Sequence, residues 1–268
     1  MTGERRASEP AAAARWADEL AAWAIPDEIL AAAPESPWGF PPALFQPADP
    51  EAVPDTPSRR RAVEALGEGG SVLDVGSGAG AASLALVPPA NAIVAVDESP
   101  DMLAALAAAA AQRGVPHEGH AGRWPDVASS VPRADVVVCH HVFYNVPDLA
   151  DFALALDDHA RRRVVVELTA AHPLTPHAPL WRHFHGIERP DGPTAELAVA
   201  VLQEAGLAVT AEPFASPPRP HRDRAEWVAF VRRRLCLPPE RDAELDVLLP
   251  SDPARMRPRQ VVTVWWNT

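Results

Sequence analysis

The sequence contains no lysine, and all 24 of its basic residues are arginine. Without a lysine amine, the chain can form no Schiff base with a carbonyl substrate and cannot anchor pyridoxal phosphate covalently. The phosphate-binding loop of P-loop nucleotide hydrolases also requires a lysine. The absence of this one residue type therefore excludes several common classes of enzyme.

Cysteine is nearly as scarce, since Cys139 and Cys236 are the only two. Neither belongs to a C-x-x-C pair, and the histidines show no H-x-x-x-H spacing, so we expect no metal site. Two isolated cysteines are typical of a reducing cytoplasm. No apolar run approaches the ~18 residues that a membrane span needs, and no apolar signal segment follows Met1. The sequence therefore predicts a cytoplasmic protein that does not insert into a membrane.

Positive charge is also in short supply, because 24 basic residues face 36 acidic ones and the net charge is −12. Such a chain is a poor nonspecific partner for nucleic acid or for an anionic membrane. A local exception is conceivable near Arg219, Arg222, Arg224 and residues 232–234. These arginines form either a basic patch or the solvated face of a helix.

The most informative feature that is present is the run Val-Leu-Asp-Val-Gly-Ser-Gly-Ala-Gly at residues 72–80. An apolar strand enters a turn with three glycines, and a helix is expected at residues 79–86. Glycine lets a backbone turn tightly and approach a ligand closely, and the N–H groups at the start of the next helix then point at that ligand. This unit predicts a site for a nucleotide-like cofactor.

Two cofactor types fit the glycine loop. Gly76, Gly78 and Ala81 satisfy the dinucleotide pattern G-x-G-x-x-G/A. Asp74 at the strand end favours a positively charged cofactor instead, since a carboxylate there would repel a pyrophosphate. Asp97 follows about 20 residues after Gly76, the distance expected for a ribose-binding carboxylate. Both cofactors contain that ribose, so Asp97 supports the fold without choosing between them.

Three motifs in order resemble the class I S-adenosylmethionine (SAM)-dependent methyltransferase family. They are the glycine loop from Ser71, the second-strand run ending at Asp97-Glu98, and the fourth-strand run 134–148. The resemblance covers roughly residues 59–210, with a last strand at 260–266. One departure is visible: after the third strand, His120 stands where the family often has Gly-Asp.

The alternation of strands and helices predicts an α/β fold with a doubly wound parallel sheet. By resemblance, the sheet has seven mostly parallel strands with helices on both faces. Residues 1–57 are expected to form a helical and irregular N-terminal cover, and residues 58–268 the SAM-binding domain. Within that domain, residues 169–192 are expected to be a long loop and 215–258 a helical insertion before the last strand. Both are candidate substrate covers.

The resemblance also implies a set of cofactor-binding residues. Gly76, Ser77 and Gly78 would line the methionine part of SAM, Asp74 would attract its amino group through water, and Asp97 would accept hydrogen bonds from the ribose. The adenine and the methyl group would lie near a second set: Glu98, Met102, Gly122, Arg123, Trp124, Cys139 and His140. Core packing is the alternative for Met102.

His141 and Tyr144 follow the fourth strand, where the methyl group should be delivered. A neutral histidine there could remove a proton from an acceptor near pH 7, and the alternative is a hydrogen-bonded structural role. Tyr144 is the only tyrosine and could orient the acceptor or simply pack. We expect no metal to take part.

These residues predict a SAM-dependent methyltransferase that leaves S-adenosylhomocysteine as product. The acceptor would be an O or N atom of a small molecule, and Trp38, Phe40, Trp181 and Phe184 in the covering segments favour an apolar or aromatic one. A methyltransferase acting on RNA or protein, an NAD-binding oxidoreductase, and a binding protein without turnover remain alternatives. The sequence does not indicate an oligomeric state.

Overall fold

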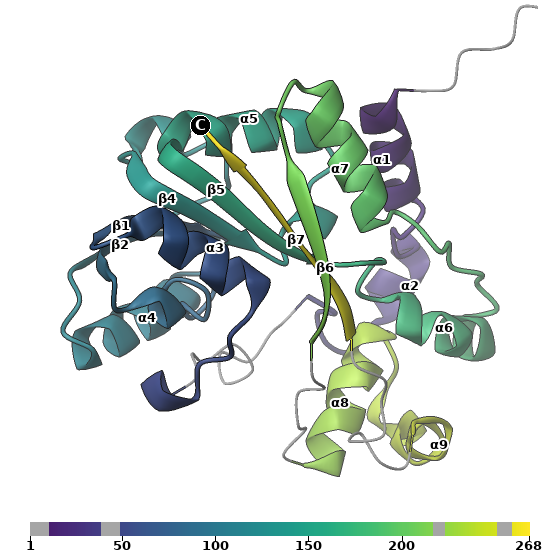
Figure 1. Ribbon diagram of the computed structural model, residues 1–268. Helices are drawn as coiled ribbons and strands as arrows, with labels where there is room; N and C mark the ends of the chain where they lie inside the picture. Colours follow the sequence, from purple (N-terminus) through teal and green to yellow (C-terminus); the bar gives the residue numbers. More distant parts are fainter. Residues whose placement is uncertain (1–10, 39–48, 217–222, 251–258) are drawn as a thin grey trace, which may run out of the picture.

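The computed structural model describes residues 11–38, 49–216, 223–250 and 259–268. Seven strands form one sheet in the order β3-β2-β1-β4-β5-β7-β6 (Figure 1). The strands are β1 (Gly70–Val75), β2 (Ala90–Asp97), β3 (His117–Ala121), β4 (Ala134–His140), β5 (Ala160–Thr169), β6 (Thr210–Ser216) and β7 (Arg259–Asn267). All neighbours pair in parallel except β7, which is antiparallel to both β5 and β6. The predicted fold class is confirmed.

Helices cover both faces of this sheet. On one face lie α3 (Pro57–Leu66) and α4 (Pro100–Gln112), which pack on side chains such as Val72 and Ile93. On the other face lie α5 (Leu149–His159) and α7 (Ala195–Glu204), which pack on Leu73 and Val164. The central strands β1 and β4 read as nearly continuous apolar runs because both of their faces are buried.

The N-terminal cover is helical, with α1 (Ala12–Ala21) and α2 (Asp27–Ala32). Helix α1 lies beside α7 (Figure 1), and its Trp16 is fully buried in the main core. The indole N–H of Trp16 donates to the Val146 carbonyl at 2.8 Å. Trp38 is exposed at its surface, whereas Phe40 and Phe45 lie outside the described residues.

Residues 169–192 are not the uninterrupted loop that we expected. They contain a short 3₁₀ turn, η6 (Thr175–His177), and helix α6 (Ala178–His185). The apolar side chains Leu180, Trp181 and Phe184 recur at helical spacing and are drawn into a second core, and Gly186 ends the helix in the left-handed conformation.

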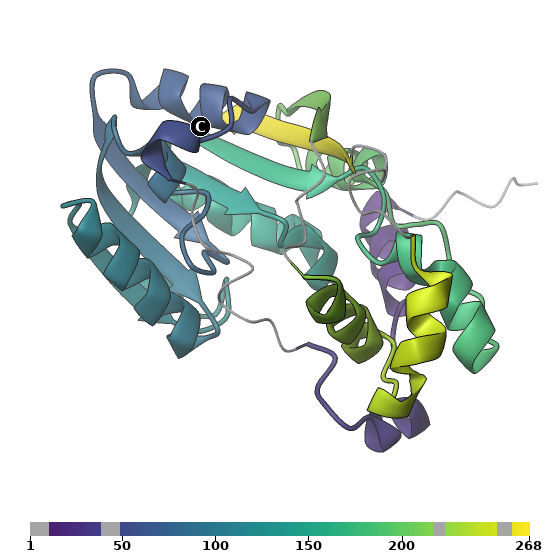
Figure 2. The same cartoon turned by 90° about the horizontal axis from the view of Figure 1, so that it is seen from below.

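The expected insertion before the last strand is helical in its described part. It comprises α8 (Arg224–Arg234), the 3₁₀ turn η7 (Pro239–Arg241) and α9 (Asp242–Leu248). A second hydrophobic cluster unites α8 and α9 with α6 and the residues around α2, and Figure 2 shows this group from below. The N-terminal segment and the insertion, far apart in sequence, therefore share one core.

The helix expected at residues 79–86 does not form. Residues 78–83 are turns, and only the 3₁₀ helix η3 (Leu84–Leu86) follows. The Asp74 carboxylate accepts hydrogen bonds from the Ser83 backbone N–H at 3.2 Å and from its hydroxyl at 2.6 Å. These bonds draw the chain back onto β1, and Gly80, with φ 87°, is held in a conformation that no α-helix contains. Other 3₁₀ turns are η2 (Pro50–Ala52), η4 (Ala128–Ser130) and η5 (Phe143–Asn145).

No helix in the described ranges combines the length and the apolar character that crossing a bilayer would require.

Candidate active site

The glycine loop follows the carboxyl end of β1 and is hydrogen-bonded to the carboxyl end of β2. The N–H groups of Gly76 and Ser77 donate to the Val96 carbonyl at 2.8 and 3.0 Å, and the N–H of Gly78 donates to Asp97 Oδ2 at 2.8 Å. These three N–H groups are therefore bonded within the protein and are not free for a ligand. The loop is held to the second strand tip by its own backbone.

Gly76 is a position where this loop has no room for a Cβ. Its φ is 69°, and a Cβ placed there would lie 2.3 Å from Val142 Cγ2. Val142 belongs to the turn after β4, so the tips of β1 and β4 approach each other closely at this point. Only glycine combines the left-handed conformation with that approach.

Asp97 ends β2 beside the loop, as the sequence predicts. Its Oδ1 accepts from the Ser99 N–H at 2.9 Å while Oδ2 accepts from Gly78. Each carboxylate oxygen can accept two hydrogen bonds. The half-buried Asp97 can therefore hold the loop and still accept bonds from the hydroxyls of a ribose.

Asp74 lies beneath the loop rather than at its surface. The side chain is 1% exposed and its Oδ2 faces Ser83. Burial raises the pKa of the Asp74 carboxyl, and the Ser83 hydrogen bonds oppose that rise. In this position Asp74 shapes the loop directly.

Around the β2–β3 edge, some of the predicted residues come together. Glu98 and Arg123 are exposed, with Oε1 and Nε 4.0 Å apart. The Gly122 N–H donates to the Asp97 carbonyl at 3.0 Å, and Met102 is 8% exposed in the first turn of α4.

Trp124 does not join this group. Its indole is buried in the main core, where its N–H donates to the Phe152 carbonyl at 3.4 Å and its ring meets His159 edge-on at 4.8 Å. The structure therefore gives the Trp124 side chain a packing role, and only its backbone lies near the expected cofactor edge.

At the tip of β4, the two neighbours Cys139 and His140 point to opposite faces of the sheet. Cys139 is fully buried in the main core, where burial raises the pKa of its thiol well above the usual value. Burial lowers the pKa of His140, and its Nε2 is enclosed without a hydrogen-bond partner among the described residues. Cys139 therefore has a packing role in the core.

His141 follows in a strained conformation, with φ 61°. Its backbone N–H donates to the Glu167 carbonyl at 2.6 Å, and its Nε2 lies 3.2 Å from Glu167 Oε1. The Arg259 guanidinium of β7 approaches the same Nε2 at 3.4 Å. Strain of this kind persists only where the surroundings fix the residue, and here Glu167 fixes both its backbone and its ring.

Glu167 is a site residue that was not predicted from the sequence. It sits near the end of β5, opposite His140 on β4, and its Oε2 also accepts a hydrogen bond from the buried Ser58 hydroxyl of α3. Burial acts to raise the pKa of Glu167, but its hydrogen bond with His141 and the nearby charge of His140 outweigh it, so the pKa is about 2. The available signal was one carboxylate inside the otherwise apolar end of this strand.

Tyr144 is brought to the same turn but is buried. Its hydroxyl donates to the Thr169 carbonyl at 2.6 Å, and burial raises the pKa of the phenol. Its ring stacks on Trp16 at 5.5 Å and meets His172 edge-on at 5.3 Å, and His172 stacks on Trp23 at 4.1 Å. These contacts favour the packing alternative for Tyr144.

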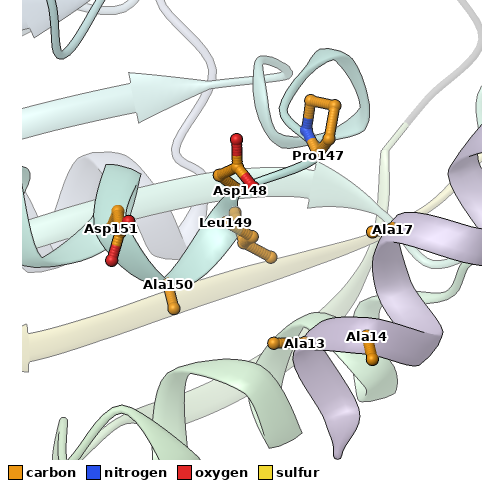
Figure 3. Close-up of a pocket in the computed structure, with 8 residues that line it drawn as sticks. All are labelled: Ala13, Ala14, Ala17, Pro147, Asp148, Leu149, Ala150 and Asp151. Atoms are coloured by element: carbon orange, nitrogen blue, oxygen red, sulfur yellow. The ribbon is translucent and has the colours of Figure 1, made fainter.

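The described residues contain no group of three or more histidine, cysteine, aspartate or glutamate side chains arranged to hold a metal ion. A pocket of about 330 Å³ lies between α1 and the start of α5 (Figure 3). Half of its lining residues are alanine, Asp148 and Asp151 lie at one side, and none of the predicted site residues is included.

Comparison with known proteins agrees with this geometry. Residues 72–162 match the family model of a methyltransferase domain. None of the curated proteins matches the sequence.

Similar solved structures include a putative sarcosine dimethylglycine methyltransferase from Galdieria sulphuraria, at 15% identity and a TM-score of 0.50, covering 78% of this chain and 82% of that one. Magnesium protoporphyrin IX methyltransferase from Synechocystis PCC 6803 with bound SAH aligns at 13% identity and 0.50, covering 79% and 82%. A structure titled for the conversion of a disulfide bond into a thioacetal group during echinomycin biosynthesis aligns at 17% identity and 0.53, covering 90% and 91%. At these identities the neighbours establish the fold. The match over residues 72–162 agrees with that fold and makes this part of the chain similar to a methyltransferase domain.

Proposed function

We propose that this protein binds SAM and transfers its methyl group to an O or N atom of a small apolar or aromatic molecule, leaving S-adenosylhomocysteine. The observation that carries the proposal is the meeting of three strand tips. The glycine loop of β1, Asp97 of β2 and the His140–His141 turn of β4 lie at one edge of the sheet. In open α/β sheets, ligands bind at the carboxyl ends of the strands.

The residues at this edge fit the cofactor. Asp97 retains acceptor capacity for the ribose hydroxyls, and Glu98, Met102 and Gly122 border the place expected for the adenine. The backbone of residues 76–78 would line the methionine part. When bound, SAM supplies an activated methyl group on a sulfonium, so the protein has mainly to position the acceptor, exclude water and take up a proton.

His141 is the proposed proton acceptor. It is half-buried at the tip of β4, with its ring beside Glu167. A histidine in this place can accept a proton from an acceptor hydroxyl or amine as the new bond to the methyl carbon forms. Tyr144 then contributes by packing, since its hydroxyl is already bonded to Thr169.

The acceptor class is inferred from the side chains beyond β4 and β5. A continuous line of ring contacts runs through Trp23, His172 and Tyr144 next to the turn after β4. Trp181 lies in the neighbouring second core. Two structural neighbours are named for small-molecule methylation, of sarcosine or dimethylglycine and of a porphyrin. The neighbours' names support a small acceptor, and the ring contacts support its apolar or aromatic character.

An RNA or protein acceptor is less well supported. The arginines that would form a basic patch are largely neutralised: Arg232 contacts Glu35 at 3.1 Å and Asp242 at 2.9 Å, and Arg224 contacts Asp246 at 2.6 Å. Arg219 and Arg222 lie outside the described residues. Ion pairs of this kind leave little local positive charge to attract a polyanion.

Two measurements test the proposal. Calorimetry should detect binding of both SAM and S-adenosylhomocysteine, and the absence of binding by either at millimolar concentration would refute it. Incubation with methyl-labelled SAM and a small-molecule extract of the producing cells should then transfer label to a product below the size of a peptide. Label found only in protein or RNA would instead favour the macromolecular acceptor.

A further inference from the structure

Glu167 combines features that a purely structural carboxylate in a strand does not need. It stands at the carboxyl end of β5, between His140 of β4 and Thr263 of β7, and its side chain is only 12% exposed. A buried carboxylate is costly unless hydrogen bonds hold it. The hydrogen-bond partners of the Glu167 carboxylate therefore indicate its role.

Two elements fix the Glu167 carboxylate from opposite sides. Ser58, 1% exposed in the first turn of α3, donates its hydroxyl to Oε2, and the Ser58 hydroxyl lies 2.9 Å from Thr56 Oγ1. On the other side, Oε1 lies 3.2 Å from Nε2 of His141. The start of α3 thus anchors a carboxylate whose other oxygen faces the turn after β4.

The charge of Glu167 determines which ring nitrogen of His141 carries the proton. An ionised carboxylate can only accept hydrogen bonds, so Nε2 must carry the proton that it faces. In the neutral ring Nδ1 is then the atom that can accept a proton. An N–H of Arg259 could donate to Nε2 only if Nε2 carried no proton. This contact is longer than the one with Glu167, at 3.4 Å against 3.2 Å.

Other charged groups surround this pair. His140 of β4 interacts electrostatically with Glu167, His141 and Asp74 of β1. The guanidinium of Arg259, on β7, opposes a positive charge on His141, whereas Glu167 favours it. Because Glu167 is the neighbour that favours the charged ring, its loss should lower the pKa of His141.

We propose that Glu167, anchored by Ser58, is a positioning residue that holds His141 with Nδ1 directed to accept a proton during methyl transfer. This role rests on the proposed function. The acceptor O or N uses a lone pair to bond the methyl carbon, the carbon–sulfur electron pair leaves on sulfur, and the acceptor proton passes to Nδ1. Glu167 then faces an imidazolium and stabilises its charge.

The first test is independent of any acceptor. Histidine ring ¹⁵N spectra of the full chain, with the His141 signals assigned by their loss in His141→Gln, should show the Nε2–H tautomer. In Glu167→Gln the pKa of His141 should fall by about 1 unit or more, as expected for removal of an opposite charge within hydrogen-bonding distance. Ser58→Ala should shift it in the same direction by less. Glu212→Gln, which removes a carboxylate bonded to Trp265 on β7, is the matched control and should leave it unchanged.

The second test separates positioning from plain structure. With methyl-labelled SAM and the small-molecule extract, Glu167→Gln should lower the initial rate at pH 7 by about 100-fold, a typical contribution of an oriented base. The acid limb of its pH–rate profile should move to lower pH, while affinity for S-adenosylhomocysteine stays within about twofold. Glu212→Gln should retain the rate.

The outcomes of the two tests are distinct. The Nδ1–H tautomer in the unaltered protein, a His141 titration unaffected by Glu167→Gln, or an unchanged rate would overturn the positioning role. Absence of both S-adenosylhomocysteine binding and label transfer by the unaltered protein would overturn the proposed function, and this catalytic role with it, even if the His141 titration behaved as expected. The two failures are therefore distinguishable.

Discussion

Gly76 shows how much of the glycine loop depends on a single missing Cβ. A residue other than glycine could adopt the left-handed backbone at a modest cost, but it could not accommodate the 2.3 Å approach of Val142 Cγ2. Gly114 offers a natural comparison, because its φ is 65° and nothing lies within 4 Å of the place that a Cβ would take. Substitution of Gly114 therefore adds only conformational strain, whereas substitution of Gly76 adds a steric clash as well.

We expect Gly114→Ala to lower the free energy of unfolding by about 1 kcal/mol, through the left-handed conformation alone. Gly76→Ala should lower it by about 2–4 kcal/mol, because overpacking adds to the strain. Val142→Ala in the Gly76→Ala background should recover part of the difference. Urea unfolding measures all four proteins, and equal losses at Gly76 and Gly114 would show that Val142 moves away at no cost.

Asp97 acts at the same scale, on both the loop and the proposed ligand. Asp97→Ala should weaken S-adenosylhomocysteine binding by about 1–3 kcal/mol, through the loss of charge-assisted hydrogen bonds. Asp101→Asn, a change of the exposed carboxylate in the first turn of α4, is the control and should bind normally. Unchanged affinity in Asp97→Ala, measured by calorimetry, would mean that the ribose does not lie at the tip of β2.

At the scale of elements, α1 is part of the main core and more than a cover. Its Trp16 is fully buried, stacks on Tyr144 and accepts contact from the turn after β4, where its indole N–H donates to the Val146 carbonyl. The sequence predicted a helical and irregular cover over residues 1–57. What this cover would pack against was not readable, because α7 and the β4 turn lie more than a hundred residues away along the chain.

Trp16→Ala should therefore cost about 3–5 kcal/mol of unfolding free energy, as for a large aromatic removed from a packed core. Trp38→Ala, at a tryptophan that is 54% exposed, should change it by less than about 0.5 kcal/mol. Denaturant titration of the two variants checks this contrast. A loss below about 1 kcal/mol for Trp16→Ala would show that α1 can detach without disturbing the core.

At the scale of the whole molecule, pH couples the site to stability. Burial lowers the pKa values of His172 and His177 to about 4, with Arg189 and Arg234 adding to the respective shifts. The unfolded chain thus binds more protons than the folded one between about pH 6.5 and 4, so stability falls as pH falls through this window. Glu167 adds a second loss of stability. It begins as pH falls below 4.5, the usual pKa of a glutamate, and is complete only near pH 2.

Between pH 7 and 5, each of these two histidines should remove about 1–2 kcal/mol of stability. The double variant His172→Gln, His177→Gln should therefore show a shallower fall than the unaltered protein, whatever its stability at pH 7. His183→Gln, at a histidine that is half exposed, should keep the original slope. Urea titrations at both pH values give the slopes, and parallel slopes for the double variant would contradict the assignment.

Part of the site could be predicted because its signals are local. The glycine pattern, Asp97 at a strand end and the apolar strands each follow from neighbouring residues, and they led to the correct fold class; the site at these strand tips stays a prediction. The prediction of a helix after the loop was wrong. Ser83 donates two hydrogen bonds to Asp74, and these hold the segment in turns despite its helical propensity. Helix α6 was missed because its apolar side is satisfied only by the second core.

The sequence by itself determined a parallel sheet with a glycine loop at its first strand tip, since glycine, acidic and apolar residues act there through the backbone within a few positions. Only the tertiary structure decided which side chains face the site. It turned Cys139 and Trp124 into the core and joined Ser58, Glu167 and His141 from three separate elements. The reason is physical: alternation along a strand assigns side chains to opposite faces, but the packing of distant elements decides which face becomes core and which carries the chemistry.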